Sequence, residues 1–174
     1  RFMLAAAMNP CPCGYFGDGR ARCMCHTAQV QRYMSRVSGP LLDRIDVHVE
    51  LAALNARELT ALEPAEPSAR IRDRVVVARE RQIRRFKDRE YVANAFMSTR
   101  DVRTMCVLDE KGLSMMRNAI TKLGLSARGF HRILKLARTI ADMDGSDAIK
   151  VKHLAEGIQY RTLDRRPLTH NCVT

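Results

Sequence analysis

Four cysteines near the start of this 174-residue sequence could together hold a metal ion. They form two Cys-x-Cys pairs, Cys11 with Cys13 and Cys23 with Cys25. Two such pairs, brought together by a loop, supply the four thiolates of a tetrahedral zinc site. Gly14 and further glycines make the connecting loop pliable enough to fold back. The pattern therefore predicts a structural zinc site.

Other uses of these cysteines stay open. Cys-x-Cys is an unusual zinc spacing, because an extended segment sends alternate side chains to opposite sides. His26 follows the second pair and could replace one thiol as a ligand. The four could also be reduced structural thiols or a redox pair, with Arg20, Arg22 and His26 as nearby groups that favour a thiolate. A disulfide framework is disfavoured, because the first residues do not resemble a secretory segment.

Composition and charge limit the class of protein. The chain is 46% hydrophobic and has a formal net charge of +11, spread along its whole length. A folded domain with a basic surface is expected, which attracts nucleic acid or nucleotide phosphates; a solvated Arg-rich face is the alternative. Aromatic residues make up 5%, with no Trp, which disfavours a single-strand binder built on stacked rings. No apolar run reaches the roughly 18 residues of a membrane span, so we expect a cytoplasmic protein without a membrane partner.

The elements that must position the cysteines are short. Residues 2–8 are apolar and predict a buried strand, and their position suggests that the chain is a piece of a longer protein. Residues 27–37 predict a helix with Thr27 as its N-cap. Residues 45–51 alternate apolar and polar side chains, which is typical of a strand with one wet face.

Beyond residue 52 the pattern becomes helical. Residues 53–67 contain Pro64 and Pro67 and predict a linker. Residues 68–166 predict a bundle of about five short helices, followed by a tail at 167–174.

Caps and apolar stripes define these helices. Ser98 with Asp101 predicts a capping box, and Ser126 predicts a further N-cap. Residues 109–123 are expected to bury Leu113, Met116, Ile120 and Leu123. The helix after Ser126 is expected to bury Phe130, Ile133, Leu134, Ala137, Ile140 and Ala141, and the last helix Leu154 and Ile158. Cys106 is expected in the core.

Several blocks of the sequence together point to a known family: residues 4–14 (LAAAMNPCPCG), 38–46 (SGPLLDRID), 126–135 (SARGFHRILK), 137–142 (ARTIAD), 153–156 (HLAE) and 159–161 (QYR). In this order they resemble the C-terminal half of the YifB/ComM family, a magnesium-chelatase-like branch of the AAA+ ATPases. The resemblance implies a mainly α chain in which residues 1–52 end an α/β AAA+ core and a helical-bundle lid follows. In that core a strand absent here lies between 2–8 and 45–51, so residues 1–52 are predicted to be less ordered than the bundle unless metal or dimerisation stabilises them.

The resemblance also implies roles for three residues. Asn9 would be the sensor-1 residue that contacts the γ-phosphate or orients water; an Asx turn before the following proline is the alternative. Arg44 would be the arginine finger that reaches a neighbouring subunit's ATP; a pair with Asp43 or Asp46 is the alternative. Arg128 would be sensor 2, in the first turn of a helix; an exposed helix-start arginine is the alternative.

The resemblance implies ATP and Mg²⁺ as cofactors of a full-length, ring-forming homo-oligomer that remodels DNA by branch migration or helicase activity. The sequence contains neither a Gly-x-x-x-x-Gly-Lys-Ser/Thr (Walker A) segment nor an acidic Walker-B strand end, so the fragment alone is expected to be inactive. A zinc-stabilised nucleic-acid-binding module without catalysis is the alternative function.

Overall fold

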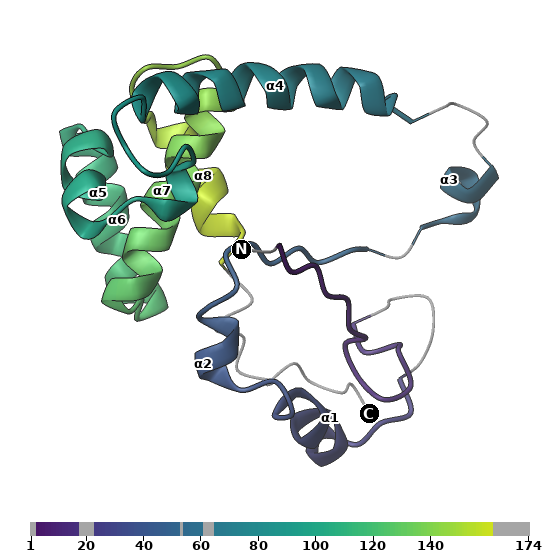
Figure 1. Cartoon of the computed structure of the whole chain (residues 1–174). Helices are drawn as coiled ribbons and strands as arrows, with labels where there is room; N and C mark the ends of the chain where they lie inside the picture. The colour runs from purple at the N-terminus through teal and green to yellow at the C-terminus, as the bar shows by residue number, and fades with distance from the viewer. Residues whose placement is uncertain (1–2, 18–22, 53, 61–64, 162–174) are drawn as a thin grey trace. The chain divides into compact units, whose positions relative to one another are not determined.

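The computed structural model describes residues 3–17, 23–52, 54–60 and 65–161, which include helices but no β-strand (Figure 1). They divide into two compact units. The first contains the described residues within 1–44 and 50–60, and the second those within 45–49 and 61–163. The expected tail at 167–174 lies outside the described residues.

The first unit has three short helices: α1 (Thr27–Met34), α2 (Gly39–Leu42) and α3 (Ala56–Thr60). The expected N-cap of α1 was wrong by one residue, because His26 occupies that position and its backbone N–H donates to Gln29 Oε1 at 3.0 Å. Ser38 is the N-cap of α2, and its hydroxyl accepts from the backbone N–H of Leu41.

Helix α3 lies inside the segment that the sequence predicts to be a linker. Asn55 and Glu58 form it by exchanging hydrogen bonds: each side chain accepts from the other's backbone N–H, at 2.9 and 2.7 Å. This reciprocal pair satisfies two N–H groups that a helix start leaves without partners.

Both predicted strands were wrong for the described residues. Residues 3–8 have no regular structure, and Met3 is 93% exposed, because the described part of the chain provides no second strand to accept their backbone hydrogen bonds. In residues 45–51 the predicted alternation is lost: Val49 and Leu51 are exposed, whereas His48 is buried.

Residues 45–49 belong to the helical unit instead. The His48 N–H donates to the carbonyl of Tyr160 at 2.9 Å, and the buried Arg161 guanidinium donates to the carbonyl of Ile45. Arg132 forms an ion pair with Asp46. The backbone of this segment therefore provides hydrogen-bond partners for the Tyr160 carbonyl and the Arg161 guanidinium, which follow the last helix.

The second unit contains α4 (Ser68–Arg85), the 3₁₀ helix η1 (Asn94–Phe96), α5 (Thr99–Met105), α6 (Glu110–Leu123), α7 (Ala127–Met143) and α8 (Val151–Gln159). Helix α7 is central, because it packs against α4, η1, α5 and α8. Its Ile133, Leu134, Ala137 and Ala141 are buried, while Phe130 and Ile140 are partly exposed. Leu154 of α8 is completely buried, and Ile158 packs against the same core.

The predicted caps of this unit are confirmed. Ser98 and Asp101 form a capping box at α5, and Ser126 Oγ accepts from the Gly129 N–H at the start of α7. Cys106 is buried in the core, as predicted. Gly124 ends α6 with φ of 53°.

The buried stripe of α6 differs from the prediction by one position. Gly112, Met116 and Ala119 are buried, whereas Leu113 and Ile120 are exposed. A Cβ on Gly112 would lie 3.0 Å from a Leu154 methyl group. The glycine thus allows α6 and α8 to approach closely, which turns the neighbouring leucine outward.

Candidate functional site

The four predicted cysteines come together in the first unit. The ligand atoms of Cys11, Cys13, Cys23 and Cys25 all lie within 4.8 Å of one another. Three Sγ–Sγ distances are 3.3, 3.7 and 3.5 Å, far longer than the about 2.05 Å of a disulfide bond. All four are free cysteines. Among the described residues this is the one group of His, Cys, Asp and Glu side chains that could hold a metal.

A tight turn overcomes the unfavourable Cys-x-Cys spacing. The Gly14 N–H donates to the Cys11 carbonyl at 3.1 Å, and Gly14 has φ of 85°. Because this backbone is turned and not extended, Cys11 and Cys13 point to the same side, with their sulfurs 3.3 Å apart. A second positive φ, 82° at Gly17, continues the reversal toward the second cysteine pair.

The sulfur cluster is also the core of the first unit. Cys11 is fully buried, Cys25 is 9% exposed, and Val30 of α1 packs with them. Few other apolar groups join this cluster: Phe16 and Met34 are partly buried against it. So small a core provides little hydrophobic stabilisation without a further link between its parts.

Without a metal, the surroundings of the cluster favour the thiolate form of Cys13 and the protonated form of Cys23 and Cys25. A hydrogen bond from the Tyr15 backbone, followed by one from the Cys11 side chain, lowers the pKa of Cys13 to about 6. The Cys25 backbone favours the Cys23 thiolate, but burial and the neighbouring sulfurs outweigh it and raise the pKa of Cys23 to about 12. The pKa of Cys25 is also raised. Several thiolates in this volume need a cation to offset their mutual repulsion.

The geometry fits a tetrahedral metal. Zinc–sulfur bonds of about 2.3 Å place the sulfurs of a tetrahedral site about 3.8 Å apart. The three Sγ–Sγ distances among Cys11, Cys13 and Cys23 lie within about half an ångström of that value, and the Cys25 sulfur lies within 4.8 Å of these three. His26 occupies the N-cap of α1 and does not belong to this group, so the four thiols are the better candidates as ligands.

The three residues expected to face a nucleotide all have exposed side chains. Asn9 lies in the first unit, two positions before the first cysteine of the cluster. Arg44 lies in the same unit, just after α2, where its Nη1 donates to the Pro40 carbonyl at 3.0 Å. Arg128 lies in the first turn of α7, in the second unit. Asp46, one of the alternative partners of Arg44, forms an ion pair with Arg132.

Comparison with known proteins assigns the family. Residues 65–161 match the family described as "Magnesium chelatase, subunit ChlI C-terminal", and residues 1–59 match "Magnesium chelatase, subunit ChlI". The chain is 40% identical to "Uncharacterized protein YifB" of Escherichia coli and 39% identical to "Competence protein ComM" of Haemophilus influenzae, in both cases over 95% of its length. The chain belongs to the magnesium-chelatase-like YifB/ComM family.

The same comparison shows how much of these relatives the chain represents. It spans 32% of the Escherichia coli YifB and 31% of the Haemophilus influenzae ComM. An uncharacterized protein of Mycobacterium tuberculosis is 32% identical over the same 95% of the chain, which is again 32% of that protein. The 174-residue chain thus spans about a third of the length of the curated relatives that it matches.

Sequence reasoning missed one polar cluster in this YifB/ComM chain. Asp142 of α7 is completely buried and receives two hydrogen bonds from Arg85 of α4, at 2.7 and 2.5 Å. Arg138, one turn earlier, lies 3.3 Å from the same carboxylate, and Asn94 Nδ2 donates to it at 2.8 Å. One signal for this cluster was present in the sequence: Arg138 and Asp142 are four residues apart, and each directly follows an alanine expected in the core, so both were candidates for burial. The cluster joins α4, η1 and α7.

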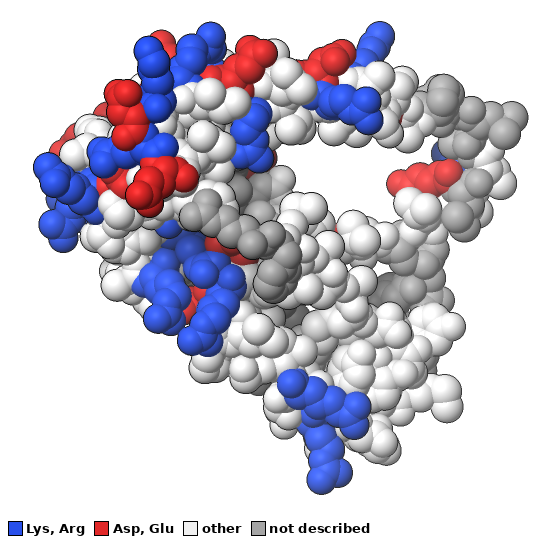
Figure 2. All heavy atoms as spheres, viewed as in Figure 1, with Lys and Arg blue, Asp and Glu red and all other residues white. Residues whose placement is uncertain are grey.

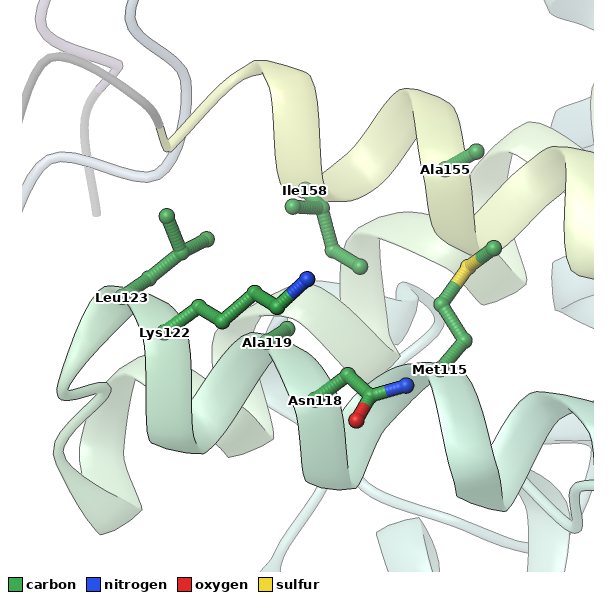
Figure 3. A pocket seen from close by; sticks show the side chains of 7 residues that line it. All are labelled: Met115, Asn118, Ala119, Lys122, Leu123, Ala155 and Ile158. Carbon is green, nitrogen blue, oxygen red and sulfur yellow. The ribbon is translucent and has the colours of Figure 1, made fainter.

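The second unit also has an apolar hollow of about 330 Å³ between α6 and α8 (Figure 3). Met115, Ala119, Leu123 and Ile158 line it, with Asn118 and Lys122 at its side. It contains no carboxylate, histidine or cysteine, so its residues offer none of the usual protein ligands of a metal ion.

Basic side chains are distributed over the surface of this YifB/ComM chain. On the face drawn in Figure 2, Lys and Arg lie in several groups, and over the helical unit acidic side chains lie among them. Among the described residues, no helix has the length and apolar character needed to cross a bilayer.

Proposed function

We propose that this chain is the C-terminal segment of a ring-forming AAA+ ATPase, in which Asn9, Arg44 and Arg128 act on ATP whose hydrolysis drives DNA remodelling by branch migration or helicase activity. The main support is that all three assigned side chains are exposed, in a chain whose family is that of the competence protein ComM. A buried position for any of them would leave no room for a phosphate.

Each residue suits its proposed role chemically. The Asn9 amide can donate to a γ-phosphate oxygen and accept from the attacking water. The Arg44 guanidinium spreads positive charge over the oxygens of a neighbouring subunit's phosphate as negative charge develops there. Arg128 lies in the first turn of α7, where the helix dipole favours an anion and slightly disfavours the arginine itself.

The remaining parts of such an ATP site come from sequence outside this chain. No residue pattern here supplies the phosphate-binding loop or the carboxylate that holds Mg²⁺. ATP and Mg²⁺ are therefore cofactors of the assembled protein, and the 174-residue chain alone should not hydrolyse ATP. The ring supplies the neighbour that Arg44 requires.

Zinc is the proposed structural cofactor of the first unit. The four-thiolate cluster has the ligand type and spacing of a closed zinc site. DNA is the proposed macromolecular partner, and the net charge of +11 supports a salt-dependent affinity for phosphates.

A zinc-stabilised nucleic-acid-binding module without catalysis is the second candidate, favoured by the cysteine cluster. It predicts stoichiometric zinc and salt-dependent DNA binding by the 174-residue chain, with no effect of Arg44 on ATP turnover by the longer protein.

Replacing Arg44 by Ala in the ring-forming protein tests the main proposal. The expected result is a kcat lower by about 10³-fold or more with ATP affinity retained, because an arginine finger acts on the transition state. Arg36→Ala is the matched control, since it removes the same charge from another exposed position of the first unit. Equal turnover in wild type and Arg44→Ala would remove Arg44 from the mechanism.

A further inference from the structure

A single residue separates Asn9 from the first cysteine of the cluster, and that residue is proline. Pro10 fixes its own φ at about −65°. It also restricts the preceding residue, Asn9, to extended conformations. The backbone between Asn9 and Cys11 therefore has few free torsions, and the position of one residue largely determines that of the other.

The Cys11 end of this link is held firmly. Cys11 is completely buried, and its carbonyl accepts from the Gly14 N–H at 3.1 Å. Its sulfur lies 3.3 and 3.7 Å from those of Cys13 and Cys23. A metal bound to these sulfurs would fix Cys11 further by direct coordination.

The Asn9 side chain lies beside the same turn. A Cβ built on Gly14 would come within 4.0 Å of Asn9 Nδ2. The amide and the first cysteine pair thus belong to one compact piece of chain, although Asn9 itself is exposed.

We infer that Pro10 is a positioning residue, which transmits the metal-fixed position of Cys11 to the Asn9 amide, so that ATP turnover depends on metal bound at the cysteine cluster. The inference rests on the proposed contact of Asn9 with ATP. Catalytic groups are sensitive to such placement, because a shift of about 1 Å can cost about 10²-fold in rate. The metal site then does more than stabilise the fold: it sets the angle at which the amide meets the nucleotide.

The test replaces Pro10 by Gly in the ring-forming protein and measures zinc content, ATP KM and kcat. We expect full zinc content, unchanged KM and a kcat lower by about tenfold, because the free torsions misplace the amide in the transition state. Pro67→Gly is the matched control. It adds the same backbone freedom at an exposed position outside the first unit, so zinc content, KM and kcat should all stay at wild-type values.

A second measurement does not depend on activity. In the zinc-loaded 174-residue chain, the NMR order parameter of the Asn9 backbone N–H should be about 0.85, and it should fall in Pro10→Gly while that of Cys13 stays high. An unchanged order parameter would contradict the inference. So would equal loss of kcat in both proline variants, or loss of zinc by Pro10→Gly, since Pro10 would then act on the cluster and not on Asn9.

Asn9→Ala separates this inference from the proposed function. If Asn9→Ala lowers kcat and Pro10→Gly does not, the positioning role of Pro10 is wrong and the sensor role stands. If Asn9→Ala leaves kcat unchanged, the sensor role is wrong and the inference fails with it.

Discussion

Arg85 and Asp142 form a two-pronged ion pair between helices α4 and α7, with N–O distances of 2.7 and 2.5 Å. Asp142 is completely buried, and the Arg85 side chain is 18% exposed. Asn94 binds both partners, at 2.9 Å to the arginine and 2.8 Å to the aspartate. This pairing satisfies the buried charges and fixes the position of α4 against the central helix.

Replacing Asp142 by Asn should destabilise the helical unit by about 3–5 kcal/mol, because it leaves Arg138 and Arg85 without a compensating charge in a buried site. Urea unfolding followed by circular dichroism measures the effect. Asp147→Asn is the control: Asp147 also pairs with an arginine, Arg81, but its side chain is 98% exposed, so its loss should cost about 0–1 kcal/mol. Equal losses in both variants would show that burial of the pair is unimportant.

Asp101 should make the helical unit sensitive to acid. Hydrogen bonds from the Ser98 side chain, then from Tyr91 and the Ser98 N–H, lower the pKa of Asp101 to about 2. Because this lies below the unfolded value of about 3.9, the carboxylate stabilises the fold above about pH 4, and the contribution is lost as pH falls toward 2. The difference in unfolding free energy between wild type and Asp101→Asn should be constant from pH 7 to 5 and shrink below pH 4. Asp73→Asn, at an exposed position of α4, should show no such trend.

Removing zinc should unfold the first unit selectively. That unit depends on the sulfur cluster and Val30 for its core, whereas the helical unit has its own apolar core. After chelation, amide hydrogen exchange should accelerate in α1 and stay slow in α7. Cys11→Ser should reproduce the loss of zinc. Cys106→Ser, which alters a buried thiol of the other unit, should keep full zinc content. Full protection of α1 in metal-free protein would contradict the structural role of the metal.

Arg128→Ala should weaken nucleotide binding by the ring-forming protein about tenfold or more, because a hydrogen bond between charged groups contributes about 1.5–3 kcal/mol. A fluorescent ATP analogue measures the affinity. Arg117→Ala removes the same charge from an exposed position of α6 and should leave the affinity unchanged. If both variants bind equally well, Arg128 is not a nucleotide contact.

The sequence was sufficient where local chemistry decides the structure. The Ser98–Asp101 capping box and the end of α6 at Gly124 follow from hydrogen bonds within a few residues, and both are confirmed. The mainly α character followed from apolar periodicity. The meeting of the four cysteines was also predictable, because glycines allow the loop between the pairs to reverse.

The failures concern contacts between distant segments. Alternation at residues 45–51 predicts a strand only if a neighbouring strand is available, and the described residues provide none. The outward turn of Leu113 depends on how closely α8 approaches Gly112, which periodicity along α6 alone does not show. Burial of Asp142 likewise depends on an arginine 57 positions earlier in the chain.

The anchoring of residues 45–49 to the end of α8 has a mechanical consequence. Ile45 is held through its carbonyl by Arg161, and His48 through its N–H by Tyr160. One peptide bond joins Ile45 to Arg44. The end of α8 therefore fixes the course of the backbone from the residue that directly follows Arg44.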